Sequence, residues 1–191
     1  PEGEKINWLH FVGINDADPY PASLALVAGL AVHEAVSPHV PPPMQALLKW
    51  PNDVLIGGAK LAGILLERVK DNVIVGIGVN LAAAPDLPDR QAVALSSFGP
   101  APDLEHFAER LAACFAVELE RWRTYGLPVT ISRWLAAAHP VGTPLTALAP
   151  DETQIQGTFA GLAEDGALQL RLTDGTTRVI HSGEVMLSAA H

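Results

Sequence analysis

The chain has 191 residues, of which 49% are hydrophobic and 17% are charged, and its formal net charge is −9. This composition is typical of a folded protein and excludes a disordered chain. The acidic balance argues against binding of nucleic acid or a membrane surface through this chain, because both need basic patches. The longest apolar stretch, residues 22–36, is too short and too polar to span a bilayer.

The single cysteine, Cys114, lies in an apolar run and is expected to be a small core residue. A chain with one cysteine forms no internal disulfide, which fits a reducing compartment. No charged segment with a cleavage site precedes the first apolar run, so the sequence predicts no secretory signal. We therefore expect a cytoplasmic protein.

The first part of the chain predicts one buried helix among short strands. Residues 7–12 are aromatic and β-branched, which favours a strand. A helix is predicted from Pro21 to about Val36, because proline suits a first turn and apolar residues surround the segment. Four further strands follow, and the continuously apolar last one belongs inside the sheet. They are expected at residues 46–50, 53–56, 60–66 and 73–79, with a hairpin turn at Gly57-Gly58.

A long loop and two helices are predicted next. Residues 82–98 show no periodicity, and long loops inside compact domains are often functional. Asp103 is expected to cap an amphipathic helix that ends at Gly126. Pro128 then begins a second helix.

The pattern changes to short strands and turns at about Val141. Five short strands in about fifty residues indicate a small β-barrel similar to the SH3 fold. These strands are expected at residues 144–148, 154–160, 167–172, 176–181 and 184–187. We therefore predict an α+β protein with two domains. Residues 1–140 would form a mixed β-sheet with helices packed on it, and residues 141–191 the barrel.

The polar residues that carry chemistry gather at two strands linked by a hairpin. Lys49-Trp50-Pro51-Asn52-Asp53 combines a cation, an amide and a carboxylate, and Lys60 opens an otherwise apolar strand. Such a lysine is either a solvated strand end or a cation aimed at a ligand. Spacing alone favours the solvated end.

Two other motifs are incomplete. Gly76-x-Gly78 follows a strand, but Leu81 stands where a dinucleotide fingerprint needs its third glycine. His33-Glu34 begins a zinc-protease motif, but Ser37 stands where the second histidine must be. The remaining histidines lack ligand spacing, so no metal site is predicted.

The sequence resembles the biotin protein ligase family, in the second half of its catalytic domain and its C-terminal domain. Five blocks match in the order and with the gaps of that family, and together they are highly specific. The blocks are Lys49 to Asp53, Lys60 to Leu65, Gly76 to Leu81, Ser132-Arg133-Trp134, and Asp165 to Leu168 with Gly183-Glu184-Val185.

The resemblance implies an ATP-dependent ligase with the catalytic fold shared by biotin and lipoate ligases. Such an enzyme joins biotin to ATP, giving biotinyl-5′-adenylate, and a lysine of a biotin carboxyl carrier domain then attacks the adenylate. Biotin is the substrate and ATP and Mg²⁺ are the implied cofactors. A homodimer is compatible with the resemblance, and we expect no contact with nucleic acid or membrane through this chain.

The resemblance also implies a role for each matching residue. Lys60 would bridge the biotin carboxylate and the α-phosphate, where a positioned ammonium lowers the barrier. Asp53 would orient the incoming lysine amine or accept its proton. The residues expected near ATP or the adenylate are Lys49, Asn52 and Asn80, with Asn80 at the adenine. The glycines expected beside biotin are Gly63, Gly76 and Gly78, where a Cβ would intrude.

Two alternatives remain open. The chain would be a non-catalytic remnant that binds a carrier or dimerises, or a lipoate-type acyl ligase. The Gly-Arg-rich loop that closes over biotin in the family has no counterpart in this sequence, so we expect the 191-residue chain alone to be inactive. One further departure lies after Gly183-Glu184-Val185. There Met186, Leu187 and Ser188 stand where some relatives carry an arginine near the nucleotide.

Overall fold

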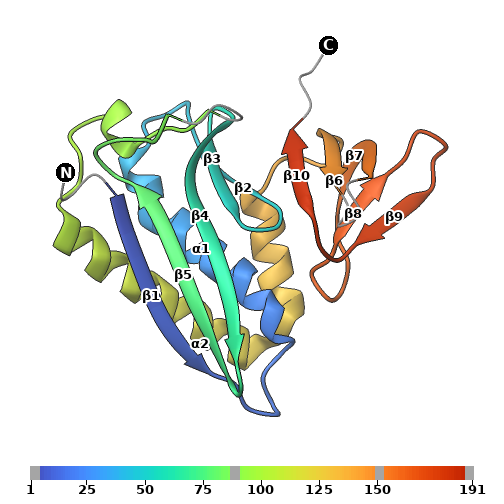
Figure 1. Cartoon of the computed structure of the whole chain (residues 1–191), viewed down its shortest axis with the longest axis horizontal. Helices are drawn as coiled ribbons and strands as arrows, with labels where there is room; N and C mark the ends of the chain where they lie inside the picture. The colour runs from blue at the N-terminus through green and yellow to red at the C-terminus, as the bar shows by residue number, and fades with distance from the viewer. Residues whose placement is uncertain (1–4, 87–90, 149–152, 188–191) are drawn as a thin grey trace.

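The computed structural model describes residues 5–86, 91–148 and 153–187, which contain two long helices and two five-stranded sheets (Figure 1). The α+β class predicted from the sequence is confirmed. Both helices lie behind the first sheet and leave its other face open (Figure 1). No helix in the described parts of the chain is long and apolar enough to cross a membrane.

The first sheet has the strand order β1-β5-β4-β3-β2. All its ladders are antiparallel rather than mixed, because tight turns join β2 to β3, β3 to β4 and β4 to β5. The apolar strand β5 is interior, as expected, between β1 and β4. The bounds are β1 Lys5–Gly13, β2 Ala46–Lys49, β3 Asp53–Ile56, β4 Ala59–Val69 and β5 Asn72–Asn80.

Helix α1, Leu24–Val36, packs between this sheet and helix α2, Leu104–Ala137. Most of α1 is buried, as its apolar circumference predicts. A short 3-10 turn, Pro21–Ser23, precedes it. Asp103 caps α2 by accepting a hydrogen bond from the backbone N–H of His106 at 3.0 Å.

The two helices predicted on either side of Gly126 form one element with a kink. Gly126 has φ 75°, a left-handed conformation that glycine adopts without steric cost, and Pro128 follows it within the helix. The chain therefore changes direction where the sequence predicted an end and a new start. This kink brings the last part of α2 next to the first.

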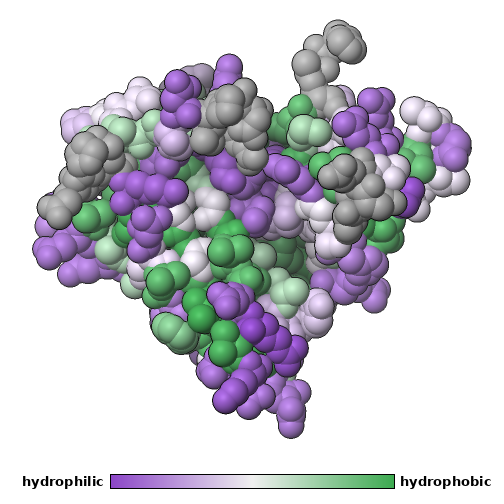
Figure 2. Space-filling view, in the orientation of Figure 1, coloured by the Kyte–Doolittle hydropathy of each residue, from purple (hydrophilic) through white to green (hydrophobic). Residues whose placement is uncertain are grey.

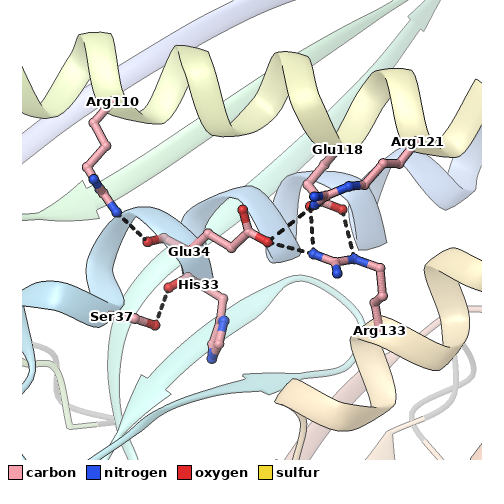
Figure 3. A network of polar contacts seen from close by, with 7 residues as sticks. All are labelled: His33, Glu34, Ser37, Arg110, Glu118, Arg121 and Arg133. Carbon is pink, nitrogen blue, oxygen red and sulfur yellow. Dashed lines mark hydrogen bonds and ion pairs between the residues drawn. The ribbon is translucent and has the colours of Figure 1, made fainter.

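An ionic network around the buried Glu118 fastens the two parts of α2 to α1 (Figure 3). Glu118, only 3% exposed, pairs with Arg121 and accepts a 2.8 Å hydrogen bond from Nη2 of Arg133. The same Nη2 atom donates to Oε1 of Glu34 at 2.6 Å. Burial, and next the neighbouring carboxylate of Glu118, raise the pKa of Glu34 above its ordinary value. Arg133, from the Ser132-Arg133-Trp134 block, therefore holds the helical layer together.

The second sheet has the order β10-β6-β7-β8-β9, which agrees with the five predicted strands. Strand β7 pairs with β6 through its first half and with β8 through its second half, so it bends around the small core. A register shift between Phe159 and Gly161 accompanies this bend. The bounds are β6 Pro144–Leu148, β7 Gln154–Leu162, β8 Leu168–Arg171, β9 Thr177–Ile180 and β10 Glu184–Leu187.

We predict that Gly157→Ala strongly destabilises the second sheet. A Cβ at this position would lie 2.5 Å from the carbonyl oxygen of Arg171, which is backbone and cannot swing away. We expect the free energy of unfolding, measured by urea denaturation, to fall by about 1–3 kcal/mol. Gly99→Ala is the control, because no atom lies within 4 Å of its added Cβ, and it should change stability by less than about 0.5 kcal/mol. Equal effects of the two variants would contradict the prediction.

Candidate active site

Four of the predicted site residues lie in one row across the open face of the first sheet. Lys49 of β2 pairs with Asp53 of β3, which pairs with Gly63 of β4, and Gly63 pairs with Gly78 of β5. Asn7 of β1 completes the row opposite Gly78. Paired residues of an antiparallel sheet point to the same face, so the row forms one continuous surface.

A β-bulge adds Lys60 to this surface. Val54 pairs with Ala62, and Leu55 pairs with Lys60, so Leu61 has no partner on β3. Without the extra residue, strict alternation from Gly63 would send Lys60 to the packed face. The bulge turns the Lys60 side chain to the open face, where its ammonium approaches Asp53 and the space above Gly63.

Asp53 is the centre of a buried cluster of charges. Its Oδ2 lies 2.9 Å from the Lys49 ammonium and its Oδ1 lies 2.5 Å from the Lys60 ammonium. The Asp53 side chain is 7% exposed and that of Lys60 is 28% exposed. Oδ1 makes this close ion contact but accepts no hydrogen bond with regular geometry from the described residues. A carboxylate this buried is tolerated because cations flank it, and it fixes both ammonium groups in return.

The Lys49 and Trp50 side chains tie this cluster to the second sheet. The Lys49 ammonium donates a 2.6 Å hydrogen bond to the carbonyl oxygen of Val185 in β10. The indole N–H of Trp50 donates to the carbonyl oxygen of Gly166, in the turn before β8, at 3.1 Å. Lys49 is thus already bound on two sides, by Asp53 and by the second sheet. These contacts engage two of the three ammonium N–H groups, so they do not exclude the nucleotide contact that the resemblance implies.

His139 borders the same junction. Burial lowers its pKa below the ordinary histidine value, and the nearby Lys49 ammonium lowers it further. The imidazole is therefore neutral at neutral pH and adds no repulsion to Lys49.

A cleft of about 600 Å³ lies over the open face of the sheet. Its polar part contains Lys60, Asn52 and Asn80 beside the row described above. Its other part runs across β1, β5 and β4, where Gly76 pairs with Leu9 on one side and with Leu65 on the other. Both leucine side chains are more than two-thirds exposed. Figure 2 shows this hydrophobic surface over the middle of the three strands. The cleft therefore suits a ligand with one anionic end and one apolar end.

Asn52 and Asn80 both serve the backbone of the site. The Asn52 amide donates to the carbonyl oxygen of Ile64 at 2.8 Å and so braces β4 beside the cluster. The Asn80 amide donates to the carbonyl oxygens of Val93 and Lys60, at 3.1 and 3.4 Å. Both residues also line the cleft, so each combines a structural contact with a position next to a ligand.

The predicted long loop runs beside Lys60. The Lys60 backbone N–H donates a 2.9 Å hydrogen bond to the carbonyl oxygen of Gln91. The Val93 backbone N–H donates a 3.0 Å hydrogen bond to the carbonyl oxygen of Lys60. A short 3-10 turn, Leu95–Ser97, interrupts the loop where the sequence indicated no structure. Residues 87–90 of the loop lie outside the described residues.

Two family models match this chain, one for each of its sheets. The Biotin/lipoate A/B protein ligase family matches residues 14–81, and the Biotin protein ligase C terminal domain matches residues 144–188. A biotin–acetyl-CoA-carboxylase ligase of Paracoccus denitrificans is 39% identical over 175 residues, which cover 86% of this chain and 72% of that protein. The chain belongs to the biotin protein ligase family.

Other relatives extend the comparison. A biotin–acetyl-CoA-carboxylase ligase of Mycobacterium tuberculosis is 35% identical, and the match covers 85% of this chain but only 61% of that protein. The crystal structure of an Aquifex aeolicus biotin protein ligase superimposes with a TM-score of 0.82 at 25% identity. That match covers 98% of this chain and 83% of the Aquifex chain. This ligase-family chain thus spans between about three-fifths and four-fifths of these relatives.

The prediction of the site from the ligase motifs missed the contribution of β1. Lys5, Asn7 and Leu9 line the cleft, and they alternate along the strand as open-face residues do. The signal was present, because the polar-apolar alternation begins at Lys5. The strand predicted from aromatic content began only at Asn7.

No group of three or more metal-binding side chains occurs in the described parts of this ligase-family chain. Both oxygens of Asp53, the carboxylate nearest the cleft, already contact lysines. The side chains around the cleft therefore do not fit a protein-held Mg²⁺, which needs unengaged carboxylates.

We predict that Lys49→Met destabilises the fold. The change leaves the Val185 carbonyl without its donor and Asp53 with one cation, so the free energy of unfolding should fall by about 1.5–3 kcal/mol. Urea denaturation measures it, with the exposed Lys70→Met as the control of equal charge change. Combining Lys49→Met with Asp53→Asn should cost less than the sum of the two, because they share one interaction. Strict additivity would mean that the ion pair contributes nothing.

Proposed function

We propose that this chain is the part of a biotin protein ligase that carries its reacting groups. In this proposal the enzyme activates biotin with ATP and transfers it to a lysine of a biotin carboxyl carrier domain. The observation that supports it best is the Lys60 ammonium. It is held by buried Asp53 above Gly63, at the boundary between the polar and apolar parts of the cleft.

The shape of the cleft matches biotin, which has a carboxylate at the end of an apolar chain. With the carboxylate at Lys60, the chain lies along Leu9, Gly76 and Leu65. An added Cβ at Gly76 would approach the Leu9 side chain to 3.4 Å, so glycine keeps this part of the cleft floor low. Gly63 and Gly78 keep the polar part low in the same way.

In the first step a biotin carboxylate oxygen attacks the α-phosphorus of ATP. A new C–O–P link forms, the bond to the bridging oxygen of pyrophosphate breaks, and pyrophosphate leaves with the bonding electrons. Two anions must approach each other, and negative charge grows on the α-phosphate oxygens in the transition state. The fixed ammonium of Lys60 stabilises that charge without having to reorganise.

In the second step the uncharged amine of the carrier lysine attacks the carbonyl carbon of the adenylate. A C–N bond forms, the C–O bond to AMP breaks, and the amine loses a proton. Asp53 holds Lys60 in both steps, and we assign it the additional task of orienting the amine or accepting its proton. Asn52 and Lys49 are the proposed neighbours of the ribose and phosphates, and Asn80 of the adenine; Lys49 also pairs with Asp53.

Among the described residues of the cleft, Mg²⁺ has no side-chain site of its own. In this proposal it arrives with the phosphates of ATP, which is the usual mode for a cation that keeps most of its waters. No step proposed here passes through the metal.

We also propose the domain organisation, oligomeric state and location of the enzyme. The two domains are residues 1–140 and 141–191, and the two separate sheets support this division. A homodimer and a cytoplasmic location remain proposals from the resemblance and the cysteine content. The expected absence of DNA binding rests on the net charge of −9.

Two alternative functions are distinguishable by experiment. A non-catalytic remnant would bind the carrier domain without releasing pyrophosphate. A lipoate-type ligase would release it with lipoate rather than biotin. The match to the biotin protein ligase C-terminal domain favours biotin over lipoate.

We predict that Lys60→Ala in the full-length protein lowers biotin-dependent pyrophosphate exchange by roughly 10²–10³. The reason is the loss of the only ammonium that both contacts Asp53 and lines the cleft within the described residues. Lys60→Arg should recover little, because the planar guanidinium is larger and directed differently. A melting curve for each variant shows that it folds. Near-normal exchange by folded Lys60→Ala protein would refute the assignment.

We predict that Asp53→Asn reduces both half-reactions and harms transfer to the carrier more. Adenylate formation should fall by up to about 100-fold, because Lys60 loses the carboxylate that holds it. Pyrophosphate exchange measures the first step, and single-turnover transfer from preformed adenylate measures the second. Unchanged adenylate formation would exclude the holding role, and equal damage to both steps would exclude the amine-orienting role.

A further inference from the structure

A second lysine lies over the cleft in the same manner as Lys60. Lys5 is the first residue of β1, and its side chain extends over Gly78. A Cβ built on Gly78 would lie 2.9 Å from Lys5 Cε and 3.3 Å from its Nζ. The first distance is shorter than real Cβ contacts, so the observed lysine position depends on glycine at 78.

The arrangement repeats on the neighbouring strand. A Cβ built on Gly63 would lie 3.1 Å from both Cε and Nζ of Lys60. Gly63 and Gly78 are paired residues, so Cβ atoms built on them would lie about 4.5–5.5 Å apart on the same face. Two ammonium groups therefore lie above two adjacent glycines, from opposite sides of one cleft.

The two ammoniums differ in their electrostatic surroundings. Lys60 contacts Asp53, and that carboxylate is shared with Lys49. Lys5 forms no ion pair with any carboxylate in the residues that the structure describes, and its neighbour over Gly78 is the neutral Asn7. Lys49, Asp53 and Lys60 together carry one positive charge, and Lys5 adds a second. Two net positive charges match the two anions that the proposed reaction joins.

The order of residues along β1 separates the two anions. Lys5, Asn7 and Leu9 follow one another on the open face, so the strand runs from a cation to the apolar part of the cleft. A ligand whose apolar chain lies at Leu9 has its carboxylate near Lys60. Lys5 is then on the far side of that carboxylate, where the attacked phosphate lies. Lys5 also pairs with Asn80, the residue proposed beside the nucleotide.

We infer that Lys5 is a binding residue for the phosphate of the nucleotide, and that Gly78 is glycine to make room for it. This inference rests on the proposed function. It assigns the polar end of the cleft a second cation that the ligase motifs of the sequence do not contain. Lys5 and Lys60 then hold the two reactants from opposite sides, so that an anionic carboxylate and an anionic phosphate can approach.

The test is Lys5→Met in the full-length protein, with Lys70→Met as the control that removes one exposed lysine far from the cleft. We expect the Kd for ATP, measured by titration calorimetry without biotin, to rise about tenfold or more. The KM for ATP in pyrophosphate exchange should rise by a similar factor. The KM for biotin should stay within about twofold of the unaltered protein, since biotin contacts Lys60. Lys5→Arg should retain most of the ATP affinity, because the charge remains.

A second variant tests the role of the glycine. Gly78→Ala should displace Lys5 and raise the Kd for ATP by a similar factor, and it should add little in the Lys5→Met background. An unchanged Kd for ATP in Lys5→Met, or an equal or larger rise in the KM for biotin, overturns the inference. If the unaltered protein shows no biotin-dependent exchange at all, the proposed function fails instead, and the ATP titration still reports on Lys5.

Discussion

The open face of the first sheet is organised by the need to neutralise one buried carboxylate. Asp53 lies in the interior of the row that crosses all five strands, where an unpaired charge would cost several kcal/mol. Each neighbouring feature meets that need. Lys49 pairs with it across β2, and the bulge at Leu61 turns Lys60 towards it. Gly63 leaves the space in which the Lys60 ammonium lies.

The same sheet keeps packing and chemistry apart. Its rear face is covered by two helices that an ionic network around buried Glu118 holds together, and this layer makes no demand on the residues of the open face. Because side chains alternate along each strand, every second residue is free to serve the cleft. The pairing of the strands nevertheless fixes their positions, so Lys49, Gly63 and Gly78 stay aligned across the sheet.

The sequence predicted the elements and most of the site for definite physical reasons. Periodicity identifies buried helices and strands, and the Lys49 to Asp53 block is too specific to be missed. Two features were beyond it. The bulge at Leu61 is a property of strand pairing, so no local pattern announces it. The bond from Lys49 to Val185 joins residues far apart in the chain. Lys5 is a different case, because the alternation that begins there is visible in the sequence, whereas aromatic content placed the start of the strand at Asn7.

The contacts between the two sheets restrict how the second sheet can move relative to the first. Lys49 and Trp50 are consecutive, yet they bind separate parts of the second β unit, Val185 in β10 and Gly166 in the turn before β8. Two anchors still permit rotation about the line that joins them. Apolar packing that includes Trp134 and Phe159, with only about 10 Å³ of free volume, resists that rotation. Two hydrogen bonds and one apolar contact therefore fix the second sheet against the first about more than one axis.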